Sequence, residues 1–242
     1  MKAFKAFKTF FKRLFYYPKW RCAVCGKEIF DDGFFCERCR ESLPFIDGAT
    51  CSHCGRKVVA DEEYCSTCKG KLIATDRARS VFNYGKPVST LIKRAKYDNA
   101  KYLLDAFSDY LAAAYFKYYF NSDCVTFVPA TDKSKKKRGY NQSEILAAQV
   151  SEKTGVPFVR AAVKTRETPR QASLNADKRR KNLAEAFRIT DKSAVAGKNV
   201  LIIDDVTTTG STGEALAEKL KKAGAAKVEL LTVASVPPKD GY

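Results

Sequence analysis

Apolar and polar positions alternate in blocks along the last two thirds of the chain. Short apolar runs predict β-strands at 80–84, 124–129, 157–163, 200–204 and 227–234. Apolar positions that recur every three or four residues predict helices at 87–95, 99–119, 140–154 and 211–223. Strands that alternate with helices in this way indicate an α/β fold with a mostly parallel central sheet.

The strand predicted at 200–204 leads into the most informative segment of the chain. Val200–Ile203 is a continuous apolar run, and Asp204 and Asp205 follow it. A hydroxyl-rich loop at 207–212 then precedes an amphipathic helix. Amides at a helix N-terminus and nearby hydroxyls can hold a phosphate, while adjacent carboxylates can accept hydrogen bonds from sugar hydroxyls or bind Mg²⁺. Neither a Walker A loop nor G-x-G-x-x-G occurs, and the order of features predicts a site for a ribose 5-phosphate.

Eight of the nine cysteines form four C-x-x-C pairs in two repeats offset by 29 positions. They are Cys22, Cys25, Cys36, Cys39, Cys51, Cys54, Cys65 and Cys68. This spacing predicts two structural zinc ions, each held by four thiolates, in preference to disulfides, a redox pair or an iron–sulfur cluster. The spacing leaves open how the eight cysteines divide between the metals. We interpret His53 as a filler residue and Cys124 as a small buried hydrophobe.

The charge is concentrated in the middle of the chain. The net charge is +17, and residues 71–199 hold 26 basic and 12 acidic residues. This surplus predicts a polyanionic partner, either nucleic acid or a phosphorylated ligand. One histidine in the whole chain makes a Ser-His-Asp or Cys-His hydrolytic site a poor hypothesis. No apolar run is long enough to span a membrane and no secretory signal pattern occurs, so we expect a cytoplasmic protein.

Two segments rich in aromatic residues each allow two interpretations. Residues 1–17 place phenylalanines at helical spacing among lysines, which predicts a basic amphipathic helix. We favour docking of this helix on the rest of the protein over contact with an anionic membrane or nucleic acid. In the helix predicted at 99–119, we favour core packing of the tyrosines and phenylalanines over a base-stacking platform.

Two cationic stretches lie in the middle of the chain. The first comprises Lys133, Lys135, Lys136, Lys137 and Arg138, and the second spans residues 164–181. Both are typical of phosphate-binding loops or a nucleic-acid surface, and a solvated charged loop is the alternative for the first.

The segment from Val200 to Thr212 resembles the signature of the type I phosphoribosyltransferases, which is an apolar strand, two acids, a spacer and a Thr-Thr-Gly-x-Thr loop. The resemblance implies that Asp204 and Asp205 hold the ribose hydroxyls of phosphoribosyl pyrophosphate (PRPP), with Mg²⁺. It also implies a set of contacts for the 5-phosphate, namely Thr208, Thr209, Gly210, Ser211 and Thr212.

The order of motifs over nearly the whole chain is similar to that of the ComF family. Cysteine pairs come first, then a strand that ends at Pro129, R-G-Y-N-Q at 138–142, R-x-T-x-x-Q-x-x-L at 166–174, and the two-acid loop. The family usually has Phe where Tyr140 stands. Membership implies a double zinc ribbon at 18–70 and a type I phosphoribosyltransferase-like domain at 75–236, and the family includes competence proteins required for DNA transformation.

The same resemblance implies roles for the cationic residues. Residues 129–143 would form a pyrophosphate loop, and residues 164–182 a mobile hood. Arg138, Arg179 and Lys96 would contact the diphosphate, with Arg138, Asp204 and Asp205 as the catalytic set. The function expected is binding of PRPP and single-stranded DNA in DNA uptake, with partners in the uptake machinery. The alternative is an active phosphoribosyltransferase with an amine or base acceptor.

Overall fold

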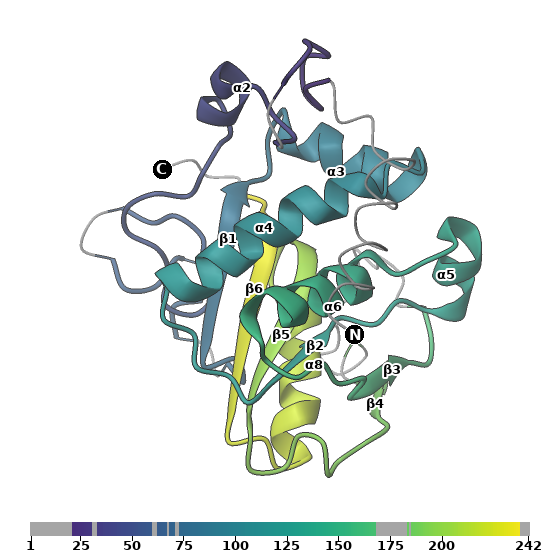
Figure 1. Ribbon diagram of the computed structural model, residues 1–242. Coiled ribbons are helices and arrows are strands. Elements are labelled where there is room, and N and C mark those ends of the chain that lie inside the picture. Colours follow the sequence, from purple (N-terminus) through teal and green to yellow (C-terminus); the bar gives the residue numbers. More distant parts are fainter. Residues whose placement is uncertain are drawn as a thin grey trace.

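A four-stranded parallel sheet lies at the centre of the computed structural model, with the strand order β1-β6-β5-β2 (Figure 1). The structure describes residues 21–30, 33–59, 62–66, 68–70, 73–167, 183 and 185–237. The strands are β1 (Arg77–Asn83), β2 (Cys124–Phe127), β5 (Asn199–Thr207) and β6 (Lys227–Ser235). β5 and β6 are apolar over most of their length because both faces of a central parallel strand are covered.

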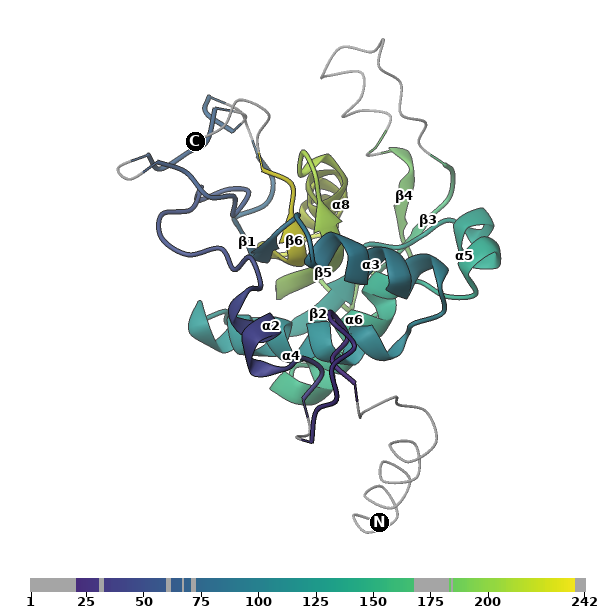
Figure 2. The same cartoon turned by 90° about the horizontal axis from the view of Figure 1, so that it is seen from above.

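Helices cover both faces of the sheet. In Figure 2, α4 and α6 lie on one side of the strands and α8 lies on the other. The helices of the α/β unit are α3 (Val88–Tyr97), α4 (Tyr102–Lys117), α5 (Asp132–Arg138), α6 (Gln142–Thr154) and α8 (Ser211–Lys222). One apolar cluster fills the space between the sheet and α3, α4 and α6, and a second fills the space beneath α8. These layers confirm the predicted α/β fold, including all four predicted helices and four of the five predicted strands.

The strand predicted at 157–163 is wrong. Phe158 forms only an isolated bridge with Val125 of β2. The chain then leaves the sheet, and β3 (Ala162–Lys164) pairs antiparallel with β4 (Phe187–Ile189) as a separate ribbon. An apolar run predicts an extended chain but does not specify its partner strand, and here residues much later in the sequence supply it.

The predicted pyrophosphate loop at 129–143 contains a helix, α5, which is a second correction. The Thr131 hydroxyl accepts a hydrogen bond from the Ser134 backbone N–H at 3.2 Å, which caps the first turn. Gly139 ends the helix in the left-handed conformation, with φ of 79°. Start and stop signals are therefore present, but α5 buries no residue, so no apolar periodicity reveals it.

The first ribbon, which comprises the described residues from Arg21 to Glu41, packs against α3 and α4. Cys22, Ala23 and Phe35 belong to the same apolar cluster as those two helices. α2 (Glu37–Glu41) is its one regular helix among the described residues. Within the part of the chain that the structure describes, no helix is long and apolar enough to cross a membrane. The predicted helix at 1–17 lies outside the described residues.

Most aromatic side chains of α4 pack in the apolar core, which agrees with the interpretation favoured in the sequence analysis. Phe107 and Tyr115 are buried, and the Tyr110 ring lies 5.2 Å from that of Phe82, centroid to centroid. Phe116 and Tyr119, at the carboxyl end of this segment, are exposed.

Candidate phosphate site and zinc centres

Asp204 and Asp205 lie inside strand β5, not after it. β5 keeps its parallel pairing with β6 as far as Thr207. The predicted strand at 200–204 therefore ends too early, because polar side chains at the edge of the core do not interrupt backbone pairing. Both carboxylates are consequently attached to backbone that is hydrogen-bonded within the sheet.

The alternation of side chains along β5 starts the two carboxylates on opposite faces of the sheet. Ile203 is part of the apolar cluster beneath α3, α4 and α6, whereas Ile202 is part of the cluster beneath α8. Since side chains alternate along a strand, Asp205 continues the face of Ile203 and Asp204 that of Ile202. At the end of the strand, however, both carboxylates are contacted from helices that cover one face, Asp204 from α6 and Asp205 from α3.

Asp204 is held by neutral hydrogen-bond donors. The Ser143 hydroxyl, in the first turn of α6, donates to Asp204 Oδ1 at 2.7 Å, and the Asp205 backbone N–H donates to the same oxygen at 2.9 Å. Burial, followed by the neighbouring Asp205 charge, raises the pKa of Asp204 to about 7 despite these bonds. Asp204 is thus poised to take up or release a proton near neutral pH.

Asp205 has a cationic partner, Lys96 from α3. Lys96 Nζ lies 2.6 Å from Asp205 Oδ2, and the side chains are only 19% and 14% exposed. Burial by itself lowers the pKa of Lys96, but the Asp205 carboxylate outweighs it and the pKa is raised. Lys96 is therefore charged. The ion pair places a residue predicted to contact the diphosphate next to one predicted to contact the ribose.

The hydroxyl-rich loop joins β5 to α8 as predicted. Gly210 precedes the helix with φ of 76°, a left-handed conformation that favours glycine, and a Cβ built there would meet nothing within 4 Å. The Thr209 and Ser211 hydroxyls lie 2.7 Å apart. The N-cap residue Gly210 has no side chain to bond the first turn of α8, where the Ser211 N–H donates to the Thr209 hydroxyl at 3.4 Å. The remaining amides of that turn could bind an anion.

Arg138 reaches the same end of the sheet from the last turn of α5. Its guanidinium donates to Gln142 Oε1 at 3.4 Å and lies 5.5 Å from the centre of the Tyr97 ring. The positive charge of Arg138 also acts to lower the pKa of Lys96, so the two cations are close. The Tyr140 hydroxyl bonds the Ala95 carbonyl and ties this segment to α3. Arg179 and most of the predicted hood lie outside the described residues.

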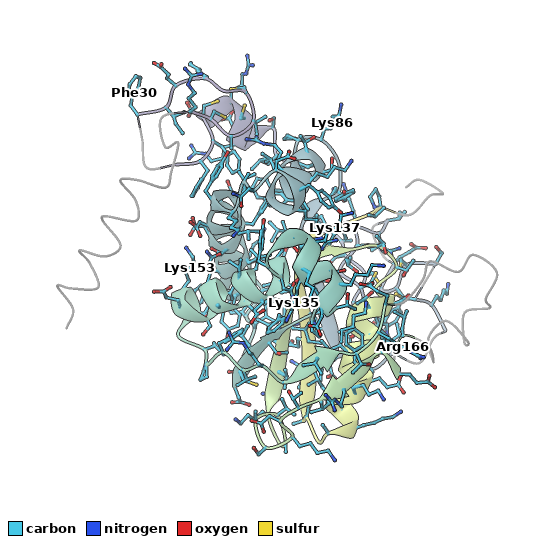
Figure 3. The ribbon with its side chains drawn as sticks, turned by 90° about the vertical axis from the view of Figure 1, so that its right-hand side faces the viewer. Phe30, Lys86, Lys135, Lys137, Lys153 and Arg166 are labelled. Carbon is cyan, nitrogen blue, oxygen red and sulfur yellow. The ribbon has the colours of Figure 1, made fainter. Side chains whose placement is uncertain are left out.

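The candidate nucleic-acid lysines of α5 separate into two groups. Lys133 and Lys135 line a cavity of about 730 Å³, whereas Lys136 and Lys137 do not. The cavity also receives four cations from β3, β4 and the flanking loops, which are Arg160, Lys164, Arg166 and Arg188. In Figure 3, Lys135 and Lys137 mark the α5 side of the molecule, and Arg166 marks the segment after β3. The cavity is positively charged even though three acids line it, which are Asp132, Glu144 and Glu167.

The eight cysteines of the four pairs form two separate clusters of four. Cys22, Cys25, Cys36 and Cys39 make one cluster, and Cys51, Cys54, Cys65 and Cys68 the other; within each, the sulfur atoms all lie within 4.8 Å of one another. This arrangement answers the question that the spacing left open, because each metal would take one repeat. A tetrahedral Zn²⁺ site requires sulfur–sulfur distances of about 3.8 Å. Sulfur pairs at 3.8 Å in the first cluster and 3.6 Å in the second fit this geometry.

Backbone hydrogen bonds around the sulfurs are repeated with the same offset as the cysteines. The Cys22 N–H donates to the Lys27 carbonyl at 2.7 Å, and the Cys51 N–H donates to the Arg56 carbonyl at 2.8 Å. Gly26 and Gly55, which directly follow Cys25 and Cys54, both adopt positive φ. In the first cluster, burial raises the pKa of Cys22, but backbone N–H groups outweigh it and lower the pKa to about 6. Such turns favour the thiolate that zinc binds.

His53 and Cys124 take the roles predicted for them. His53 stacks on Tyr64 with 4.7 Å between ring centroids and lies outside both sulfur clusters. Cys124 is fully buried in the sheet, and burial raises the pKa of its thiol.

Comparisons with known proteins agree with both halves of the structure. A double zinc ribbon domain model matches residues 13–69, and a phosphoribosyl transferase domain model matches residues 136–240. The DNA utilization protein YhgH of Escherichia coli strain K12 is 32% identical over 160 residues, which cover 64% of this chain and 70% of that protein. The chain belongs to the ComF family. Competence protein F of Haemophilus influenzae is 30% identical over 64% of this chain and 71% of that protein. Competence protein ComFC of Bacillus subtilis strain 168 is 26% identical over 64% of this chain and 62% of that protein.

Two residues at the site of this ComF-family chain escaped sequence reasoning. Ser143 donates a hydrogen bond to Asp204. Arg56 belongs to the second ribbon, which comprises the described residues from Thr50 to Gly70, and it donates a hydrogen bond to the Thr208 carbonyl in the hydroxyl-rich loop. Ser143 directly follows the R-G-Y-N-Q motif, so its position was a usable signal. Arg56 lies 152 positions before its partner, and no local pattern connects the two.

Proposed function

We propose that this ComF-family chain binds PRPP with Mg²⁺ at the carboxyl end of β5. The observation that carries the proposal is the convergence of two carboxylates, a glycine-containing hydroxyl loop and two cations at one end of a parallel sheet. The ribose hydroxyls would bond Asp204 and Asp205, and the 5-phosphate would bond the loop from Thr208 to Thr212 and the first turn of α8. Lys96 and Arg138 would face the diphosphate.

Charge complementarity supports this placement of the ligand. PRPP carries negative charge at both ends, and the cations of α3 and α5 lie beside the acids that would bind its sugar. Mg²⁺ would supply additional positive charge to the diphosphate when bound, with carboxylate oxygens available to it or to its waters. A bare nucleic-acid backbone would instead be repelled by two carboxylates, which favours a ligand that has sugar hydroxyls to donate.

We further propose that the chain binds single-stranded DNA and acts in DNA uptake in the cytoplasm, with partners in the uptake machinery. Its relatives are named as competence and DNA utilization proteins. The cation-lined cavity beside α5 offers a place for a phosphate backbone next to the proposed PRPP site. One protein would thereby handle a strand and sense a nucleotide precursor.

Calorimetry of PRPP–Mg²⁺ binding tests the ligand. The wild type should bind, whereas Asp204→Asn with Asp205→Asn should lose most of the affinity. Asp191→Asn is a matched control, because Asp191 is exposed and bonds only locally to Ser193 and Ala194 in the contacts described. No binding by the folded wild type, or equal binding by the double variant, would refute the proposal.

An active phosphoribosyltransferase is the second candidate. The cavity of about 730 Å³ could admit an acceptor base or amine, and Lys164 in its lining interacts electrostatically with Asp204. Displacement of pyrophosphate passes through a transition state with oxocarbenium character, so charge stabilisation by Arg138 and Lys96 would matter more than a strong nucleophile. Release of pyrophosphate from PRPP on addition of a base or amine would support catalysis. If the double variant Asp204→Asn with Asp205→Asn still released pyrophosphate at the same rate, this site could not be the catalytic one.

A further inference from the structure

The two zinc ribbons share one backbone design but contact different parts of the molecule. Position 27 in the first ribbon corresponds to position 56 in the second, and the bridges Arg21–Glu28 and Thr50–Lys57 keep the same offset. The first ribbon packs beneath α3 and α4, where Arg94 donates to the Ala23 carbonyl at 2.6 Å. The second ribbon lies against the hydroxyl-rich loop.

Arg56 makes this second contact. Its side chain is almost completely buried, with the residue 4% exposed, and its guanidinium donates to the Thr208 carbonyl. Its Nε has no hydrogen-bond partner among the described residues. Lys27, its counterpart, is exposed. A buried guanidinium is costly unless it is compensated, so this residue marks a specific interface.

The main chain of Arg56 is part of the zinc centre. Its N–H donates to the Cys54 sulfur, and its carbonyl accepts from the Cys51 N–H at 2.8 Å. Four thiolates and one Zn²⁺ carry two negative charges, which would compensate the guanidinium beside them. A continuous path of bonds therefore runs from Cys51 and Cys54, which would hold the metal, to Arg56 and Thr208.

Two further contacts hold the second ribbon and the segment after it against the α/β unit. A Cβ on Gly55 would lie 2.6 Å from the Ala78 carbonyl oxygen of β1, whereas a Cβ on Gly26 would meet nothing within 4 Å. The segment after the second ribbon bonds the first turn of α8, where the Thr75 hydroxyl donates to Glu214 at 2.8 Å. Both sides of the hydroxyl-rich loop are thus tied to the second ribbon or to its linker.

We propose that Arg56 is a positioning residue through which the second zinc centre sets the conformation of the phosphate loop. Zinc occupancy at Cys51, Cys54, Cys65 and Cys68 is then coupled to affinity for a ligand with a 5-phosphate. The affinity part rests on the proposed PRPP site, whereas the positioning part does not. Because coupling between two binding events is reciprocal, PRPP–Mg²⁺ should also raise the zinc affinity of the second centre.

The main test compares Arg56→Ala, Arg56→Lys and the matched control Lys27→Ala in the full chain. Each variant is first checked for two zinc ions per chain. Hydrogen exchange of the peptide covering residues 206–212 should be about tenfold faster in Arg56→Ala, intermediate in Arg56→Lys and unchanged in Lys27→Ala. Affinity for PRPP–Mg²⁺ by calorimetry should fall about tenfold in Arg56→Ala, which corresponds to about 1.4 kcal/mol.

The outcomes separate the two proposals. Unchanged exchange and unchanged affinity in zinc-loaded Arg56→Ala would overturn the positioning role. Faster exchange with no PRPP binding even by the wild type would refute the PRPP site while supporting the positioning role. If Arg56→Ala does not fold, equilibrium competition for zinc between the wild type and a chromogenic chelator decides. The zinc affinity of one of the two centres should rise when PRPP–Mg²⁺ is present, and two unchanged affinities in a PRPP-binding protein would overturn the coupling.

Discussion

Replacement of Lys96 by methionine should destabilise the protein by removing the charge that faces Asp205. Methionine keeps most of the length and apolar volume of the lysine stem, so the main change is electrostatic. The carboxylate left behind borders a small space lined mostly by Ile92, Ala95, Leu146 and other apolar side chains. Its direct cationic partner would then be gone, and Arg138, the other cation of the site, bonds Gln142 instead.

The magnitude follows from the geometry of the pair. At the observed 2.6 Å and an effective dielectric constant of about 20, the Coulomb attraction is about 6 kcal/mol. Desolvation of both groups offsets much of this attraction. Removal of one partner of a fully buried pair costs about 3–5 kcal/mol, and the remaining exposure of both groups reduces our expectation to about 2 kcal/mol.

Urea unfolding of a double-mutant cycle measures this value. The cycle comprises the wild type, Lys96→Met, Asp205→Asn and the double variant, each in the presence of zinc and followed by circular dichroism. With a slope of about 2 kcal/mol per M, Lys96→Met should lower the midpoint by about 1 M. The double variant should recover most of that loss, because the uncompensated carboxylate is gone.

A coupling energy below about 0.5 kcal/mol would refute the reasoning. The pair would then be equivalent to an exposed ion pair. A double variant less stable than Lys96→Met would also refute it, since the carboxylate would then stabilise the fold through other contacts.

Three further predictions concern the same end of the sheet. The pKa of Asp204 is raised on folding, so protonation of this carboxyl stabilises the folded state. This contribution to stability is fully present below about pH 4 and is lost as the pH rises through about 7. Asp204→Asn should therefore raise the urea midpoint at pH 8 but not at pH 4, and equal shifts would contradict this. Gly210→Ala should cost about 1 kcal/mol by thermal unfolding, because its φ is 76° but its Cβ would meet no atom within 4 Å; a much larger loss would indicate a clash. In fluorescence anisotropy, Lys133→Ala with Lys135→Ala should weaken single-stranded DNA binding and flatten its salt dependence more than Lys136→Ala with Lys137→Ala, which removes the same charge outside the cavity. Equal losses would exclude the cavity as the binding place.

Much of the candidate site could be predicted from local sequence. The β5 strand, the two acids, the glycine at the helix start and the cysteine spacing all act through neighbours within a few residues. Backbone conformation and metal-ligand geometry are short-range properties, so the residue types reveal them. The structure added the division of the cysteines into two consecutive sets.

The rest depended on contacts between distant segments. α5 has no buried face, so its capping residues gave the one local signal. The pairing of β3 with β4 joins segments more than 20 residues apart. Arg56 and Lys96 reach the site from elements far from β5 in the sequence, and a basic residue in a local pattern does not indicate which distant carbonyl or carboxylate it will meet.

The continuation of β5 through Thr207 has a consequence for the entropy of ligand binding. Asp204 and Asp205 are attached to backbone whose conformation is already fixed by pairing with β6, and Thr207 also accepts a hydrogen bond from Val236 at 2.9 Å. Only Thr208 to Gly210 lie between this strand and α8. Ordering one residue costs about 1–2 kcal/mol, so a ligand that fixes this short segment loses at most about 3–6 kcal/mol of conformational freedom. The contacts of Asp204 and Asp205 with the ligand's sugar would therefore be offset by little ordering of the protein backbone.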